Sequence, residues 1–192
     1  MAHIPELHTT PPGLRLYGDF HRHVELLISV LFSIADEHRG AALDGENRRL
    51  LSTTLQAFAG AAVTHSADRD TSLLPRLRTV VDPRAVSLLD QLRGFQDDHR
   101  TAEDRRDAVD ALGARWLRRG TLKAGEARAL REHLAYLARL HRRHIEFEDR
   151  RLLPVLERIL SGVELQAIQD ELLGRRFVNQ PPASGPSENL PD

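Results

Sequence analysis

The chain of 192 residues contains no cysteine, and its only aromatic residues are six phenylalanines, two tyrosines and one tryptophan. Without cysteine, disulfide bonds and thiolate ligands are excluded, so any metal must be held by imidazole and carboxylate groups. No stretch approaches the roughly 20 consecutive apolar residues of a membrane span, and the first residues lack the apolar run of a signal peptide. We therefore expect a soluble, cytoplasmic protein.

An excess of charge of either sign is also lacking. The chain has 27 Lys and Arg against 28 Asp and Glu, which leaves a net charge of −1. Because the two signs are interleaved along the sequence, no strong field attracts nucleic acid or an acidic membrane, and neither is expected as a partner. The length suits one domain. What the chain does have is ten histidines, and several of these fall within apolar patterns.

Apolar residues recur at helical spacing along most of the chain, and no strand pattern is present. An extended arm is expected over residues 1–17 and a disordered, proline-rich tail over residues 178–192. Between them, at residues 18–177, helices are predicted from about 19 to 37, from about 44 to Pro75, from 84 to 119, from about 121 to 160, and from about 161 to 177. Pro75 should disturb or end its helix. Pro154 should kink its helix without stopping it, because the apolar pattern continues beyond it.

Four long helices with short connections, followed by a short fifth, favour an all-α fold. The expected architecture is an antiparallel up-down-up-down four-helix bundle. In such a bundle, functional sites are built from inward-facing residues of neighbouring helices.

One segment carries a spacing typical of metal ligands. His144 and Glu148 are four residues apart, so they lie one above the other on a helix face. Residues 65–75 repeat this layout: His65 is followed five positions later by Asp70, as His144 is by Asp149, and both copies end in Leu-Leu-Pro. The repeat differs at one position, because Arg69 stands where the other copy has Glu148.

Further histidines lie on inward faces of the other predicted helices. His21 precedes an apolar stripe, with His23 as the competing candidate, and His99 interrupts an apolar row with Glu103 one turn below it. Each of these histidines taken singly could be an ordinary core residue. His133 and His141 are interpreted as structural or orienting residues, not as ligands.

Together these residues resemble the hemerythrin-like family, which is named for its His-His-Glu cation-binding domain. The resemblance covers roughly residues 18–175, and Leu-Leu-Pro is similar to the family's Leu-Phe-Pro. It implies metal ligands on all four helices. The implied ligands are His21, His65, His99, His144 and Glu148 or Asp149. Asp70 and Glu103 lie within about a turn of these histidines and are additional candidate oxygen donors.

The family resemblance implies a non-haem iron site, often with two bridged irons, that handles dioxygen, nitric oxide or peroxide. Imidazole and carboxylate would also suit zinc or manganese. Arg69 occupies the place of the family's helix-two carboxylate, and a guanidinium cannot coordinate a cation. Three outcomes are open: Arg69 turns to the rim while Asp70 or Glu103 replaces the lost ligand, Arg69 pairs with Glu148 beside a mononuclear site, or its charge replaces the metal. The last outcome would leave a metal-free bundle with a scaffold or interaction role.

Overall fold

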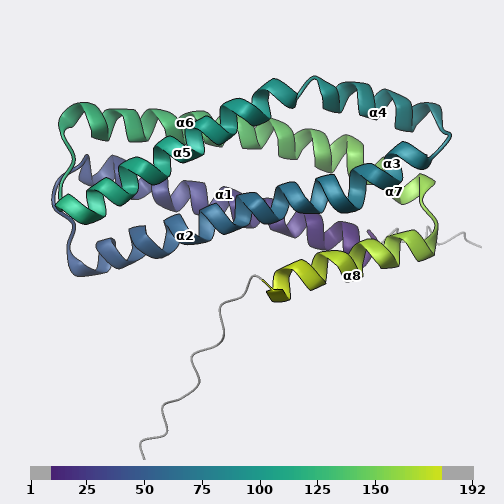
Figure 1. The fold of residues 1–192 in the computed structure, drawn as a ribbon, viewed down its shortest axis with the longest axis horizontal. Coiled ribbons are helices and arrows are strands. Elements are labelled where there is room, and N and C mark those ends of the chain that lie inside the picture. The colour runs from purple at the N-terminus through teal and green to yellow at the C-terminus, as the bar shows by residue number, and fades with distance from the viewer. Residues whose placement is uncertain (1–9, 179–192) are drawn as a thin grey trace, which may run out of the picture.

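The computed structural model describes residues 10–178, apart from the side chains of residues 96–99 and 177–178. Within this part every regular element is a helix (Figure 1). The α-helices are α1 (Pro12–His38), α2 (Gly45–Ala67), α3 (Leu74–Thr79), α4 (Pro83–Arg93), α5 (Gln96–Arg119), α6 (Ala124–Phe147), α7 (Leu153–Ile159) and α8 (Gly162–Val178). Two π-helical turns, η1 (Asp68–Leu73) and η2 (Glu148–Leu152), join α2 to α3 and α6 to α7.

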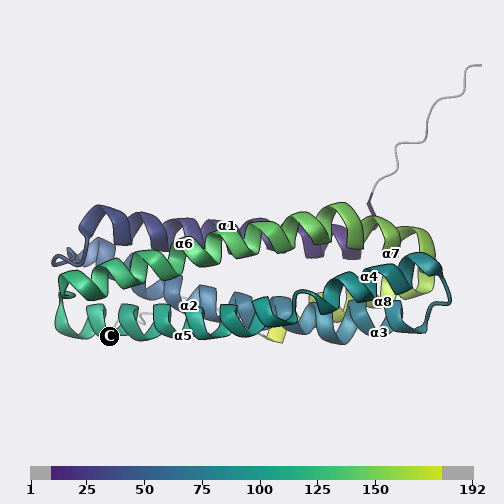
Figure 2. The same ribbon diagram turned by 90° about the horizontal axis from the view of Figure 1, so that it is seen from above.

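The helices form four long rods that lie side by side, with α8 running along the outside of one half of the rods (Figures 1 and 2). The rods are α1, α2 with α3, α4 with α5, and α6 with α7. Contacts join α1 to α2 and α6, and join α5 to α2 and α6, while α8 packs on α1 and η1. Within the described part of the chain, no helix is both long enough and apolar enough to cross a bilayer.

The apolar core is divided into two clusters along the rods. One contains Val24, Leu31 and Phe58 with their neighbours from α1, α2, α5 and α6. The other contains Leu14 and Tyr17 of α1 with residues of α3, α4, α7 and α8. Along α1, the buried His21 lies between Tyr17 of the second cluster and Val24 of the first. The polar site described below is therefore located where the two clusters meet.

Both Leu-Leu-Pro segments follow a π-helical turn. Pro75 and Pro154 are near the starts of α3 and α7, immediately after η1 and η2. A proline within a helix has no N–H to donate, and its ring clashes with the carbonyl four residues earlier. The widened i→i+5 turn accommodates this clash. The rods continue to Thr79 and Ile159, so Pro75 disturbs its rod without ending it, and the continuation past Pro154 is confirmed.

The expected extended arm is wrong for its last residues. Helix α1 begins at Pro12, and its Leu14 and Tyr17 are fully buried. Proline is favoured in the first helical turn because the missing N–H would have no partner there. Gly13 allows close packing of α8, because a Cβ at this position would lie 2.9 Å from the backbone nitrogen of Gln169. Residues 1–9 lie outside the described part of the chain.

Two other boundaries also differ from prediction. The single helix expected over residues 84–119 is broken at Gly94 and Phe95, whose backbone N–H groups donate to the carbonyls of Gln91 and Leu92 three residues earlier, both at 3.1 Å. These tighter turns separate α4 from α5. At the C-terminal end, Val178 is the last residue of α8 and not the first of a tail, while residues 179–192 lie outside the described part.

Candidate metal centre

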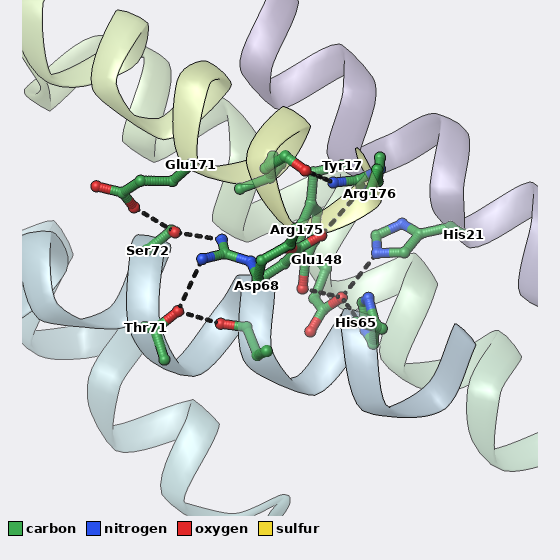
Figure 3. Close-up of polar contacts among 12 residues, drawn as sticks. Tyr17, His21, His65, Asp68, Thr71, Ser72, Glu148, Glu171, Arg175 and Arg176 are labelled. Carbon is green, nitrogen blue, oxygen red and sulfur yellow. Dashed lines mark hydrogen bonds and ion pairs between the residues drawn. The ribbon is translucent and has the colours of Figure 1, made fainter. Parts of the chain in front are cut away.

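Glu148 is the centre of a buried polar cluster between the rods (Figure 3). Its side chain projects from η2, and the residue is 3% exposed. His21 Nε2 lies 2.9 Å from Glu148 Oε2, and His65 Nε2 lies 3.5 Å from the same oxygen. The helices α1 and α2 thus each bring one imidazole to a carboxylate from the fourth rod.

His21 contacts a second carboxylate through its other nitrogen. Its Nδ1 lies 2.9 Å from Asp149 Oδ1. Burial alone would lower the pKa of His21, but hydrogen bonds with Asp149 and Glu148 raise it to about 9. In the metal-free cluster His21 is therefore an imidazolium between two carboxylates, with Nδ1 hydrogen-bonded to Asp149 and Nε2 within ion-pair distance of Glu148. Burial would raise the pKa of Glu148, but the hydrogen bonds from His21 and His65 hold that pKa well below its ordinary value.

Tyr17 adds a third contact to Glu148. Its hydroxyl donates to Glu148 Oε2 at 3.1 Å, and its ring lies 4.8 Å from the ring of His21 and 5.1 Å from that of His65. Burial and the negative charge of Glu148 raise the pKa of Tyr17 well above its ordinary value, so the phenol keeps its proton. Tyr17 was missed because it fell within the predicted arm. Its position one turn before His21 on the same helix face could have indicated it.

Arg69 does not pair with Glu148. Its Nε donates to Asp70 Oδ1 at 2.9 Å and one terminal nitrogen donates to Oδ2 at 3.3 Å, although the residue is only 9% exposed. Burial would lower the pKa of the guanidinium, but the bonds to Asp70 raise it, so Arg69 is cationic. None of the three outcomes considered included a pair between Arg69 and Asp70: the first placed Arg69 at the rim and used Asp70 or Glu103 as the replacement ligand, and the second paired Arg69 with Glu148. Asp70, engaged with Arg69, does not contribute to the Glu148 cluster.

His144, predicted to share a site with Glu148, is outside the cluster. Its ring packs edge-on against Phe95, with centroids 4.7 Å apart. The N–H of Glu148 still donates to the carbonyl of His144, but the two side chains have different neighbours. His144 instead lines a cavity of about 200 Å³ together with His65, Arg69 and His141.

His141 is the most strongly perturbed histidine of this cavity. Burial lowers its pKa to about 3, and the neighbouring His65 and His144 act in the same direction. Its ring is therefore neutral near pH 7. The Nε2 atom of His141 is buried and has no hydrogen-bond partner in the described structure.

The other residues predicted as metal ligands lie around the Glu148 cluster and the cavity beside it. Asp149 contacts His21 but is largely exposed, whereas Glu103 is on the rim of the cavity near Arg106. His23 is exposed and packs against Phe20, so His21 is the histidine of α1 that reaches the cluster. The backbone of His99 belongs to α5, but its side chain lies outside the described part, and its predicted ligand role stays a prediction.

A second polar cluster, which the sequence did not indicate, anchors α8 beside the site (Figure 3). Asp68 is fully buried and accepts bonds from Arg175 Nε at 2.6 Å and from a terminal nitrogen of Arg176 at 2.9 Å. Glu171 of α8 accepts from Ser72 and pairs with Arg76. These contacts join α8 to η1, the turn that immediately follows the His65 segment.

The donor set of the Glu148 cluster fits a transition-metal ion. One ligand atom from each of His21, His65 and Glu148 lies within 4.8 Å of the others, as three ligands of one ion must. Two imidazoles and a carboxylate are ligands that iron, zinc and manganese accept. The bond from Asp149 to the outer nitrogen of His21 is the arrangement that commonly orients a metal-binding histidine.

The sequence matches the Hemerythrin HHE cation binding domain over residues 13–156. This region contains α1 to η2 and all three residues of the Glu148 cluster. The chain therefore belongs to the hemerythrin family, whose name records cation binding. Comparison with curated proteins and with solved structures gave no match.

Proposed function

We propose that the chain binds one non-haem metal ion, iron, through His21, His65 and Glu148, and that this ion handles dioxygen, nitric oxide or peroxide. The observation that carries the proposal is the convergence of these three side chains from separate rods in a buried position. Membership of a cation-binding family supports it. Zinc or manganese could occupy the same ligands, so the choice of iron rests on the family.

Bound iron would supply redox chemistry and coordination positions that the three protein ligands leave open. The protein residues fix the geometry of the site. Asp149 orients His21 through Nδ1, and the Tyr17 hydroxyl fixes Glu148 through Oε2. Because His21 and Glu148 are buried, their side chains are shielded from bulk water.

The centre is proposed to be mononuclear because of Arg69. This residue occupies the position at which a helix-two carboxylate would serve a second ion, and the cationic side chain stays mostly buried. A guanidinium near the cavity disfavours a second cation there. Asp70 partly neutralises this charge, which is compatible with one ion at the Glu148 cluster.

The rods are proposed to form an antiparallel up-down-up-down bundle. The short connections between successive rods and the contacts of α1 with α2 and α6 support this arrangement. A cytoplasmic location is likewise proposed, because a chain without cysteine fits a reducing compartment.

A second candidate function is a metal-free scaffold, and one observation favours it. In the absence of metal, His21 as an imidazolium bonds to both Glu148 and Asp149, so the polar cluster is stable without an ion. A protein of this kind would use its site for structure only.

Elemental analysis of protein purified without added metal, followed by anaerobic iron loading, separates the two functions. About one iron per chain, lost in the His21→Ala variant and kept in His23→Ala, is expected for the proposed site. Nitric oxide should then give a paramagnetic iron adduct in the loaded wild type. Only traces of transition metal in both states would support the scaffold.

A further inference from the structure

One side chain lines both the cavity beside the metal centre and a pocket between α1 and α6. A second cavity, of about 320 Å³, is lined by residues of α1 and α6. His141 lines this outer pocket and also lines the inner cavity of about 200 Å³ that contains His65. Among the described residues it is the one common to the two linings, so the His141 side chain lies between the two cavities.

The two cavities differ in the chemistry of their surroundings. The inner cavity has charged groups, Asp70, Glu103 and Arg106, on its α2–α5 side. The outer pocket, on the opposite side of His141, has Ile28, Phe32 and Ala138 along its wall, and the polar residues Glu25, Ser29 and Arg142 in this lining are exposed. An uncharged diatomic molecule can enter an apolar passage without a large desolvation cost, whereas a hydrated ion would have to lose its water.

The His141 side chain is held by packing and not by a hydrogen bond at its buried nitrogen. His141 Nε2 has no hydrogen-bond partner in the described structure, and the ring contacts Phe58 at a centroid distance of 6.4 Å. Rotation of a side chain held in this way does not require the loss of a bond at Nε2. The absence of a bond at Nε2 among the described residues therefore removes one obstacle to rotation of the His141 ring.

We propose that the pocket between α1 and α6 is the entry route for a small uncharged ligand, dioxygen or nitric oxide, and that His141 is the gate to the metal centre. The inference rests on the proposed function for the destination of the ligand. The route itself is a property of the protein without metal. His141 acts by position in this proposal and is not assigned as a ligand.

The route can be tested without metal by dissolved dioxygen, which is paramagnetic and speeds the relaxation of nearby protons. In the metal-free protein, NMR should show stronger relaxation of the ring protons of His141 and His65 than of the buried Trp116 ring. The Ser29→Phe variant should reduce this effect at His141, because Ser29 lines the outer pocket. The matched control is Ser33→Phe, an exposed serine one turn along α1 that does not belong to the pocket lining.

In iron-loaded protein, stopped-flow measurement of nitric oxide association should show about tenfold slower binding in Ser29→Phe and about tenfold faster binding in His141→Ala, with Ser33→Phe unchanged. Equal relaxation and association rates in Ser29→Phe and Ser33→Phe would overturn the route. Dioxygen relaxation at His141 that Ser29→Phe reduces, in a protein that binds no iron, would support the route and contradict the proposed function.

Discussion

The guanidinium of Arg69 bonds to the carboxylate of its neighbour Asp70, with Nε 2.9 Å from Oδ1. No ion pair joins Arg69 to Glu148 among the described residues, and Glu148 contacts His21, His65 and Tyr17 instead. The arginine thus leaves the three candidate ligands available while placing a positive charge beside the inner cavity. This relationship makes the effect of Arg69 on metal number testable.

Replacing Arg69 with glutamate should increase the metal content of the protein. The substitution changes the local charge by two units and places a carboxylate four residues after His65, beside a cavity that His141 and His144 also line. We expect the iron content of anaerobically loaded protein to rise from about one toward two per chain, because imidazole with carboxylate is a suitable donor set. Elemental analysis and titration with Fe(II) would measure this.

The control for this prediction is Arg78→Glu, which makes the same charge change at an exposed arginine of α3. Arg78→Glu should leave the metal content unchanged. An equal metal content in Arg69→Glu and in the wild type would show that Arg69 does not limit the number of ions.

The sequence was sufficient to predict the rods and two of the histidines that meet, but not the partners of Glu148. Helical spacing identified His21 and His65 because each continues an apolar stripe of its helix, and that stripe faces inward in any bundle. Helical spacing also placed His144 beside Glu148, whereas Glu148 contacts His21, His65 and Tyr17 among the described residues. These partners of Glu148 come from α1 and α2, and periodicity along a single helix does not show which residues of other helices a side chain meets.

Other features were missed because they depend on contacts between distant segments. Asp68 is buried by arginines more than 100 residues away in α8, and no local pattern indicates that pairing. The Arg69 guanidinium could likewise pair with either of two carboxylates, that of its neighbour Asp70 or that of Glu148 in another rod. The choice between them is decided by the packed geometry and not by spacing along one helix.

Removal of the Tyr17 hydroxyl should destabilise the metal-free protein. The hydroxyl donates to the buried carboxylate of Glu148, and hydrogen bonds to charged groups contribute about 1.5–3 kcal/mol. Tyr17→Phe keeps the ring packing, so a loss of this size in the free energy of unfolding is expected from chemical denaturation. Tyr136→Phe is the control, because Tyr136 is half-buried and its ring packs under Arg105, and its change should be within about 0.5 kcal/mol. A neutral Tyr17→Phe would show that the hydroxyl does not stabilise the buried carboxylate.

The stability of the metal-free protein should fall as pH rises from neutral to alkaline. The folded-state pKa of His21 is about 9, above its ordinary value of 6.5. Its contribution is therefore complete below pH 6.5 and is lost as pH rises through 9, for a total of about 3 kcal/mol. Urea unfolding between pH 6.5 and 9.5, with a chelator present, should show this decline.

The His21→Gln variant provides the comparison for that pH dependence. A neutral amide does not titrate, so its unfolding free energy should be flatter across the same range, while His23→Gln should follow the wild type because His23 is exposed. If wild type and His21→Gln decline in parallel, His21 is not an imidazolium between the two carboxylates.

The bonds between α8 and Asp68 should be among the largest polar contributions to stability. Asp68 is fully buried, and Arg175 and Arg176 are its two cationic partners in the described structure. The double variant Arg175→Met/Arg176→Met would leave a buried carboxylate without a counter-charge, which typically costs about 3–5 kcal/mol.

The matched control is Arg118→Met/Arg119→Met, a pair of adjacent exposed arginines at the end of α5, and it should change stability by less than about 1 kcal/mol. Adding Asp68→Leu to the first double variant should restore most of the loss, since no buried charge then remains. Denaturation curves for the three variants measure these differences, and a double variant as stable as its control would show that the Asp68 cluster does not hold α8 to the bundle.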